Sequence, residues 1–123
     1  MTIIEVINRV DNIKPNSYGI TEKIRWLSEL DGIIQNEIFD THEGGENISF
    51  SGYTEDVELD TVLLVPAPYD DIYLRWLEAQ IDYCNEDTTQ YANSMAMFNV
   101  AYSSFDRYYN RAYMPLGRKI KFF

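Results

Sequence analysis

The chain has 123 residues, which suits one domain with a hydrophobic core of its own. Its formal net charge of −10, from 10 basic and 20 acidic side chains, argues against general binding to nucleic-acid phosphates. The single cysteine, Cys84, excludes an internal disulfide and stands in a helical pattern typical of a small buried hydrophobe. The sequence lacks a signal peptide's basic segment and any apolar stretch near the roughly 18 residues of a membrane span. We therefore expect one soluble domain over residues 1–123, made in a cytoplasm, with no membrane partner.

Two helices are predicted before residue 41. Thr2 and Glu5 have the spacing of a capping box, and apolar residues follow at helical intervals until Pro15 ends the segment. The second helix runs from near residue 20 to about Asp40, because apolar side chains recur there every three or four positions. This stripe consists of Ile20, Ile24, Leu27, Leu30, Ile34 and Ile38.

Residues 41–62 form an acidic segment without a helical period, which we interpret as a loop or a short β-hairpin arm. Two apolar pairs, Ile48/Phe50 and Val57/Leu59, alternate with polar residues as two short strands would. A loop of about twenty residues is unusual in a compact domain and often binds a partner. The candidate partner-binding side chains of this arm are Ile48, Phe50 and Tyr53.

The last two helices follow a short extended run that ends at Pro66. Pro68 suits the first turn of the third helix, which ends near Asn85. In the fourth helix apolar residues alternate steps of four and three, which serves either the core or a seam between copies. These residues are Tyr91, Met95, Phe98, Tyr102, Phe105, Tyr109 and Ala112. The predicted fold class is mainly α: a four-helix domain with a short β-hairpin or extended loop between the second and third helices.

Residues 114–123 form a basic tail whose candidate partner-binding cations are Arg118, Lys119 and Lys121. Five of the 10 basic residues follow Asp106, the last of the 20 acids, so residues 1–106 carry 5 − 20 = −15 and the remainder +5. An acidic body with a basic end favours head-to-tail association of identical copies. The alternative is a solvated tail that follows a favourable charge at a helix C-terminus.

The sequence contains no recognisable catalytic constellation. His42 is the only histidine, and its neighbours match no metal-binding spacing, so we expect a solvent-exposed loop histidine. Gly44 and Gly45 lack the lysine and the helix start of a phosphate-binding loop. The 20 acids offer many carboxylate pairs, but nothing singles out one pair for acid–base chemistry. We therefore expect no enzyme activity, no cofactor, and no catalytic or metal-binding residue.

A series of local strings spans most of the chain, from about residue 13 to 115. The strings are Ile13-Lys14-Pro15-Asn16, Lys23 through Arg25-Trp26-Leu27 with Leu30-Asp31, Leu64-Val65-Pro66-Ala67-Pro68-Tyr69-Asp70-Asp71-Ile72-Tyr73, Glu78-Ala79-Gln80-Ile81-Asp82, Tyr91-Ala92-Asn93-Ser94, Phe98-Asn99, and Tyr109-Asn110-Arg111 with Pro115. In this order they resemble small head–tail connector (head-completion adaptor) proteins of bacteriophages and prophages of Gram-positive bacteria. None of the strings is a catalytic signature, so their order carries the resemblance.

The resemblance implies a helical protomer that forms a ring of identical copies in the virion and is assembled in the bacterial host cytoplasm. Its implied partners are other copies of the chain, the phage portal protein and tail-completion proteins. It implies no cofactor and no sequence-specific nucleic acid. Two alternatives stay open: another morphogenesis role, such as tail completion or an assembly chaperone, and an acidic regulatory binding protein. A regulatory protein that mimics nucleic acid needs a continuous anionic face.

Overall fold

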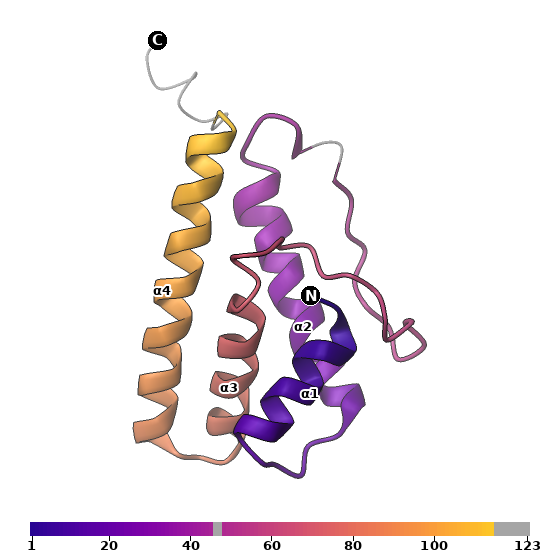
Figure 1. The fold of residues 1–123 in the computed structure, drawn as a ribbon, viewed down its shortest axis with the longest axis vertical. Coiled ribbons are helices and arrows are strands. Elements are labelled where there is room, and N and C mark those ends of the chain that lie inside the picture. The colour runs from indigo at the N-terminus through magenta and orange to yellow at the C-terminus, as the bar shows by residue number, and fades with distance from the viewer. Residues whose placement is uncertain (46–47, 115–123) are drawn as a thin grey trace.

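The computed structural model describes residues 1–45 and 48–114, and within these ranges the protein is mainly helical (Figure 1). Its helices are α1 (Ile3–Ile13), α2 (Ile20–Ile34), α3 (Ile72–Cys84) and α4 (Thr88–Ala112), and α2 continues directly into the π-helix η1 (Gln35–Phe39). The prediction of four helices is confirmed. The basic tail beyond Met114 lies outside the described residues.

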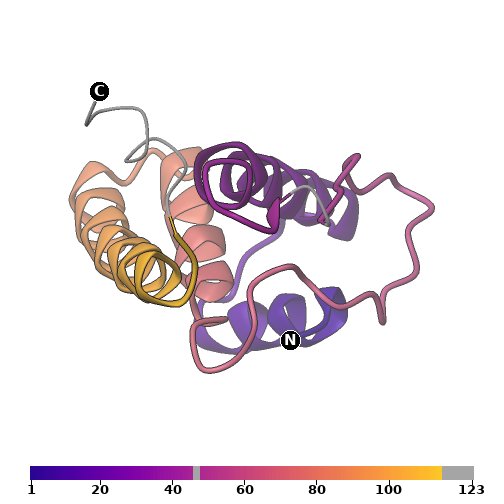
Figure 2. The same ribbon diagram turned by 90° about the horizontal axis from the view of Figure 1, so that it is seen from above.

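The helices enclose one core, with α3 at its centre. α1 begins at its predicted cap, where the Thr2 hydroxyl accepts a hydrogen bond from the Glu5 amide at 3.3 Å. The α2 stripe is buried from Ile24 onward, whereas Ile20 at its start is 47% exposed. α3 lies between the other helices and contacts α1, α2 and α4 (Figures 1 and 2). Its buried residues are Ile72, Tyr73, Leu74, Leu77, Ala79, Ile81 and Asp82.

α4 stands at one edge of the bundle and runs antiparallel to α3 (Figure 1). From its predicted apolar series, Phe98, Phe105 and Tyr109 are buried. The ring of Phe39 in η1 meets Phe105 edge-on, with centroids 6.2 Å apart. The centre of the series therefore serves the core of this protomer, and the outer face of α4 leaves side chains such as Val100 64% exposed.

The predicted β-hairpin within residues 41–62 is wrong, because the described part of this arm contains no strand. The arm pairs instead with the start of the chain, where the Ile4 amide donates to the Leu59 carbonyl at 2.9 Å. An isolated antiparallel bridge joins Thr2 to Val62. Leu59 is half-buried against the core, so the alternating pattern marks side chains turned toward the core rather than two paired strands.

α3 begins at Ile72, four residues after the start predicted at Pro68. The residues between form turns, in which the Tyr69 amide donates to the Pro66 carbonyl at 3.0 Å and the Ile72 amide to the Tyr69 carbonyl at 3.4 Å. The Tyr69 ring stacks on Tyr108 of α4 with centroids 4.7 Å apart. These turns are needed because the chain has to cross from the arm to the centre of the bundle before a helix can start.

Candidate assembly surfaces

From residue 48 onward the arm lies on the side of the bundle away from α4 (Figures 1 and 2). Ile48 and Tyr53 pack half-buried against the core, and the Phe50 ring lies against Tyr53 with centroids 4.8 Å apart. The Tyr53 amide also donates to the Ser28 hydroxyl of α2 at 3.0 Å. The structure thus brings Phe50 and Tyr53 into contact, while Ile48 and Tyr53 help to hold the arm on the bundle.

The Asp31 carboxylate anchors the arm, although the residue pattern had given it no role. It is fully buried in α2, where the Tyr53 hydroxyl donates to Oδ2 at 2.5 Å and the Tyr73 hydroxyl of α3 donates to Oδ1 at 2.6 Å. The Tyr73 hydroxyl in turn accepts a hydrogen bond from the Val65 amide at 2.7 Å. Burial raises the pKa of Asp31 above its ordinary value of 3.8, and the hydrogen bonds from Tyr53 and Tyr73 oppose that rise. One carboxylate therefore links α2, α3 and the arm.

Three buried charged side chains, Lys23, Asp31 and Asp82, were missed, although the sequence carried a signal for Asp31. Asp31 stands four residues after Leu27 and three before Ile34, inside the apolar stripe of α2. A carboxylate at such a position needs hydrogen-bond donors, and tyrosines supply them here. Lys23 is likewise buried, with 2% exposure, and its ammonium lies 2.7 Å from an Asp11 carboxylate oxygen.

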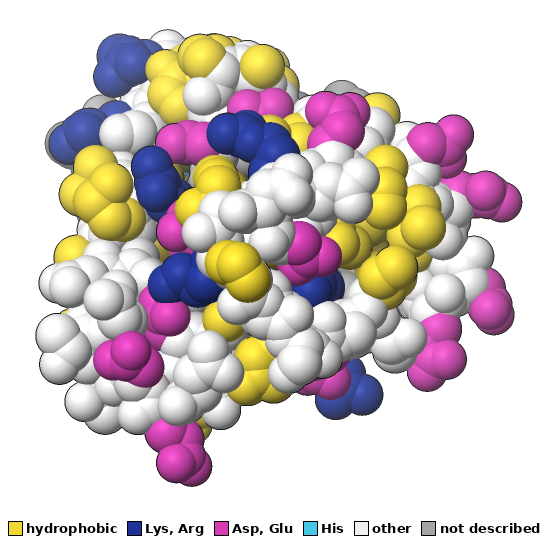
Figure 3. Space-filling model, turned by 60° about the horizontal axis from the view of Figure 1, so that its bottom comes forward, with side chains coloured by type: hydrophobic (Ala, Val, Ile, Leu, Met, Phe, Trp, Pro, Cys, Tyr) yellow, Lys and Arg dark blue, Asp and Glu magenta, His cyan; other side chains and the backbone are white. Residues whose placement is uncertain are grey.

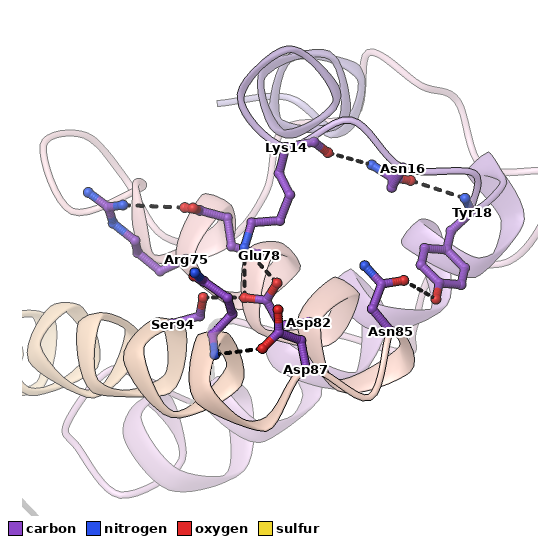
Figure 4. A network of polar contacts seen from close by, with 10 residues as sticks. Lys14, Asn16, Tyr18, Arg75, Glu78, Asp82, Asn85, Asp87 and Ser94 are labelled. Carbon is purple, nitrogen blue, oxygen red and sulfur yellow. Dashed lines mark hydrogen bonds and ion pairs between the residues drawn. The ribbon is translucent and has the colours of Figure 1, made fainter.

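At the base of the bundle, a polar network joins the α1–α2 connection to the α3–α4 turn (Figure 4). Lys14 Nζ lies 2.6 Å from Oδ1 of Asp82, whose side chain is only 5% exposed. The Ser94 hydroxyl of α4 donates to Oδ2 of the same carboxylate at 2.5 Å. The Tyr18 hydroxyl donates to the side-chain carbonyl of Asn85 at 2.7 Å. These contacts fix the position of the α3–α4 turn.

A pocket of about 570 Å³ opens at the α3–α4 turn, beside this network. Tyr83 and Tyr91 contribute to its wall, and their ring centroids are 5.5 Å apart. Tyr83 is 65% exposed, and Cys84, predicted to be buried, is exposed at the end of α3. Glu86 and Asp87 also line the pocket. The pocket therefore combines uncovered apolar side chains with acids.

The opposite end of α4 carries cations. Arg107 and Arg111 are exposed, and neither forms an ion pair with a described residue. The three predicted contact residues of the tail, Arg118, Lys119 and Lys121, lie outside the described residues. Along the chain, α4 thus runs from an acidic pocket to a basic end.

The prediction of a solvent-exposed His42 is wrong, because its side chain turns inward and is 3% exposed. Nδ1 lies 2.5 Å from the carbonyl oxygen of Ile38, and Nε2 lies 2.6 Å from Oδ1 of Asn110 in α4. The ring also meets Tyr109 edge-on, with centroids 4.8 Å apart. Both ring nitrogens therefore have partners inside the protein, and the residue joins the end of η1 to α4.

Neither a metal centre nor a membrane-spanning helix is found in the described part of the chain. Across residues 1–45 and 48–114, no three His, Cys, Asp or Glu side chains are grouped so that they could hold a metal ion. No helix in the same ranges is long and apolar enough to cross a membrane. A comparison with protein families, curated proteins and solved structures finds no match for the chain.

Proposed function

We propose that the protein is a non-catalytic structural component of a phage or prophage particle, a head–tail connector that assembles as a ring between portal and tail. The ordered strings from about residue 13 to 115 suggest the particle and the place within it. The helical protomer and the distribution of charge along α4 support assembly into a ring.

The observation that carries the proposal is the separation of two unlike surfaces along α4. Its start adjoins the pocket with Glu86 and Asp87, and its end carries Arg107 and Arg111. The 20 to 24 residues from Asp87 to these arginines hold the two surfaces roughly 30–36 Å apart, at about 1.5 Å per residue along α4. Contact between unlike patches of identical copies produces a ring when the rotation between neighbours closes.

The arm suits contact with a second kind of partner. Because residues 48–62 of the arm lie away from α4, copies that join through the ends of α4 leave the outer side of this part accessible. That side exposes the carboxylates of Glu55, Asp56, Glu58 and Asp60. An acidic ring component also lets DNA pass without binding its phosphates.

The alternative of a nucleic-acid mimic is less well supported by the surface. Figure 3 shows the molecule with its base brought forward; basic side chains lie among acids and hydrophobic patches in the centre and at the left of this face, and acids alone gather along its right edge. The basic side chains interrupt the negative charge over much of this face. A mimic of a phosphate backbone needs a continuous row of negative charge instead.

Native mass spectrometry of the full chain over a range of concentration and salt tests self-association. We expect a closed, ring-sized oligomer that weakens as salt rises, since salt screens contacts between exposed charges. Arg118→Glu combined with Lys119→Glu should weaken association at low salt. The matched control, Arg9→Glu with Arg25→Glu, makes the same change in net charge at exposed positions of α1 and α2. A tight dimer with no larger species, or equal losses in both variants, contradicts a charged ring interface.

Disruption of the gene in the bacterium that carries it tests the place in the particle. After prophage induction we expect heads and tails that stay separate in electron micrographs, and joined particles once a plasmid supplies the protein. Tails of abnormal length would indicate tail completion, and absence of the protein from purified particles would indicate an assembly chaperone. Normal particles from the disrupted strain would refute a role in morphogenesis.

A further inference from the structure

The pocket at the α3–α4 turn exposes apolar side chains to solvent, and contacts within the protein already hold these side chains in place. Tyr83 is 65% exposed and adjoins the exposed Cys84, although both residue types gain by burial. The rings of Tyr83 and Tyr91 already contact each other, and the Lys14–Asp82 ion pair holds the turn. The volume of about 570 Å³ falls within the range of about 300–1,000 Å³ typical of ligand pockets. It is large enough to receive an aromatic side chain.

The pocket is also lined by acidic side chains. Glu86 is exposed and forms no ion pair with a described residue, while Asp87 uses one carboxylate oxygen to accept a hydrogen bond at the start of α4. Burial and, after it, the Glu22 carboxylate raise the pKa of the Cys84 thiol, so a third acid lies near the pocket. An occupant that combines cations with apolar side chains therefore matches both properties of the surface.

One segment of this chain has that composition. Residues 118–123 have the sequence Arg-Lys-Ile-Lys-Phe-Phe, in which cations and apolar side chains are interleaved. They follow Met114, which lies beyond the end of α4 that is remote from the pocket. Even fully extended, the four residues from Met114 to Arg118 span at most about 14 Å, whereas Glu86 precedes α4 and lies roughly 37 Å of helix from its far end. This segment of one copy therefore does not reach the pocket of the same copy.

We propose that the pocket of one copy binds residues 118–123 of the next copy, with the aromatic side chains against Tyr83 and Tyr91 and the cations against Glu86. The inference rests on the proposed ring and names the surface through which neighbouring copies join. Donor and acceptor lie at opposite ends of α4, so each copy uses both and the contact is heterologous.

Cys84 makes this contact testable in the full chain, because it lines the pocket and is the only cysteine. Residues 119–123 are replaced by cysteine one at a time, and each protein is oxidised with diamide. A disulfide requires Cα atoms within about 7 Å, so a docked segment crosslinks efficiently. Since each copy then carries one donor and one acceptor thiol, we expect a ladder of dimers, trimers and larger species at one or more positions. Reduction should collapse the ladder to monomer.

Two control variants separate docking from random collision. Thr54→Cys places the second thiol at an exposed position of the arm, away from α4, and should give little crosslinking. Cys84→Ser, added to the best tail variant, should end the ladder at the dimer. No ladder at any tail position, or a ladder of equal yield from Thr54→Cys, overturns the proposal.

A charge exchange gives a second measurement that keeps the cysteine unchanged. Glu86→Lys and Arg118→Glu should each raise the Kd of self-association by about tenfold, and the double variant should recover most of the loss. Glu86 is exposed, and Arg118 lies outside the described residues. Circular dichroism checks that each variant is folded. Losses that add in the double variant count against the contact.

Native mass spectrometry of the same samples distinguishes this inference from the proposed function. If the wild type forms a closed ring but no cysteine variant gives a ladder, the proposed ring stands, and its copies must join through another surface. If the cysteine variants give a ladder but the wild type forms only open chains, and the gene disruption leaves particles normal, the contact between copies stands and the connector role is refuted.

Discussion

Replacement of Asp31 should destabilise the protein far more than replacement of an exposed acid. Asp31→Ala leaves the buried Tyr73 hydroxyl and the half-buried Tyr53 hydroxyl without their acceptor. A hydrogen bond to a charged group contributes about 1.5–3 kcal/mol, and two short ones are lost here together with a longer one of 3.4 Å from the Leu64 amide. Part of this loss is offset, because a carboxylate with no described ion-pair partner is no longer buried. We expect the free energy of unfolding to fall by about 2–4 kcal/mol.

Asp31→Asn is the matched variant, since it keeps the shape of the side chain. Its amide oxygen accepts from one tyrosine and its amide N–H donates to the other, so the expected cost is about 1 kcal/mol or less. Glu29→Ala, at an exposed position of the same helix, should change stability by no more than about 0.5 kcal/mol.

The stability contributed by Asp31 should also depend on pH. Its pKa is raised on folding from 3.8, so between that value and the folded pKa the native state binds more protons than the unfolded state. The contribution of Asp31 is therefore largest below pH 3.8 and falls as pH rises through the folded pKa. Asp31→Asn lacks this titration, so the stability of the wild type relative to this variant should decline over the same window.

Urea denaturation followed by circular dichroism measures all these variants, and a double-mutant cycle with Tyr53→Phe isolates the Asp31–Tyr53 hydrogen bond. We expect a coupling free energy of about 1 kcal/mol or more between the two changes. If Asp31→Ala were neutral or stabilising, the hydroxyl donors would not offset the burial of this carboxylate, and the reasoning would be refuted. A coupling free energy of zero would show that the Asp31–Tyr53 hydrogen bond does not contribute to stability.

Two further predictions concern packing and charge. Gly45→Ala should lower the free energy of unfolding by about 1–3 kcal/mol, because an added Cβ would lie 1.8 Å from the Phe39 carbonyl oxygen. Gly32→Ala, where an added Cβ meets nothing within 4 Å, should be neutral or stabilising in the same urea denaturation assay, and equal effects of the two substitutions would contradict this explanation. Lys14→Met should cost about 2–4 kcal/mol, because Asp82 stays buried without its cation. Adding Asp82→Asn should restore part of that loss, and its failure to do so would show that Lys14 acts through packing.

The helices were predictable where an amphipathic face is buried. The buried face of α1 and the buried centre of α4 both have the period that the sequence displays. The arm was misread as a hairpin because apolar and polar side chains do alternate over residues 57–60. The backbone of this segment, however, forms its hydrogen bonds with the first residues of the chain and not with a second strand of the arm. A period of two identifies alternating side chains and not the partner of the backbone.

The buried polar residues were predictable only in part, because their partners are remote in sequence. His42 is satisfied by Asn110, 68 residues further along, and Asp31 by Tyr73, 42 residues further along. No local pattern announces such pairs. The pocket had the same difficulty, since Cys84 follows a helical period that suggested burial, and the end of α3 exposes it instead.

The backbone pairing between the arm and the start of the chain also has a dynamic consequence. The Ile3 amide donates to the Thr61 carbonyl at 3.1 Å, and the Leu63 amide donates to the Met1 carbonyl at 3.0 Å. The first amides of an isolated helix lack partners, so the start of α1 is protected only while the arm is in place. Amide hydrogen exchange at Ile3 and Leu63 should then proceed through one shared opening event, which makes α1 and the arm a single cooperative unit.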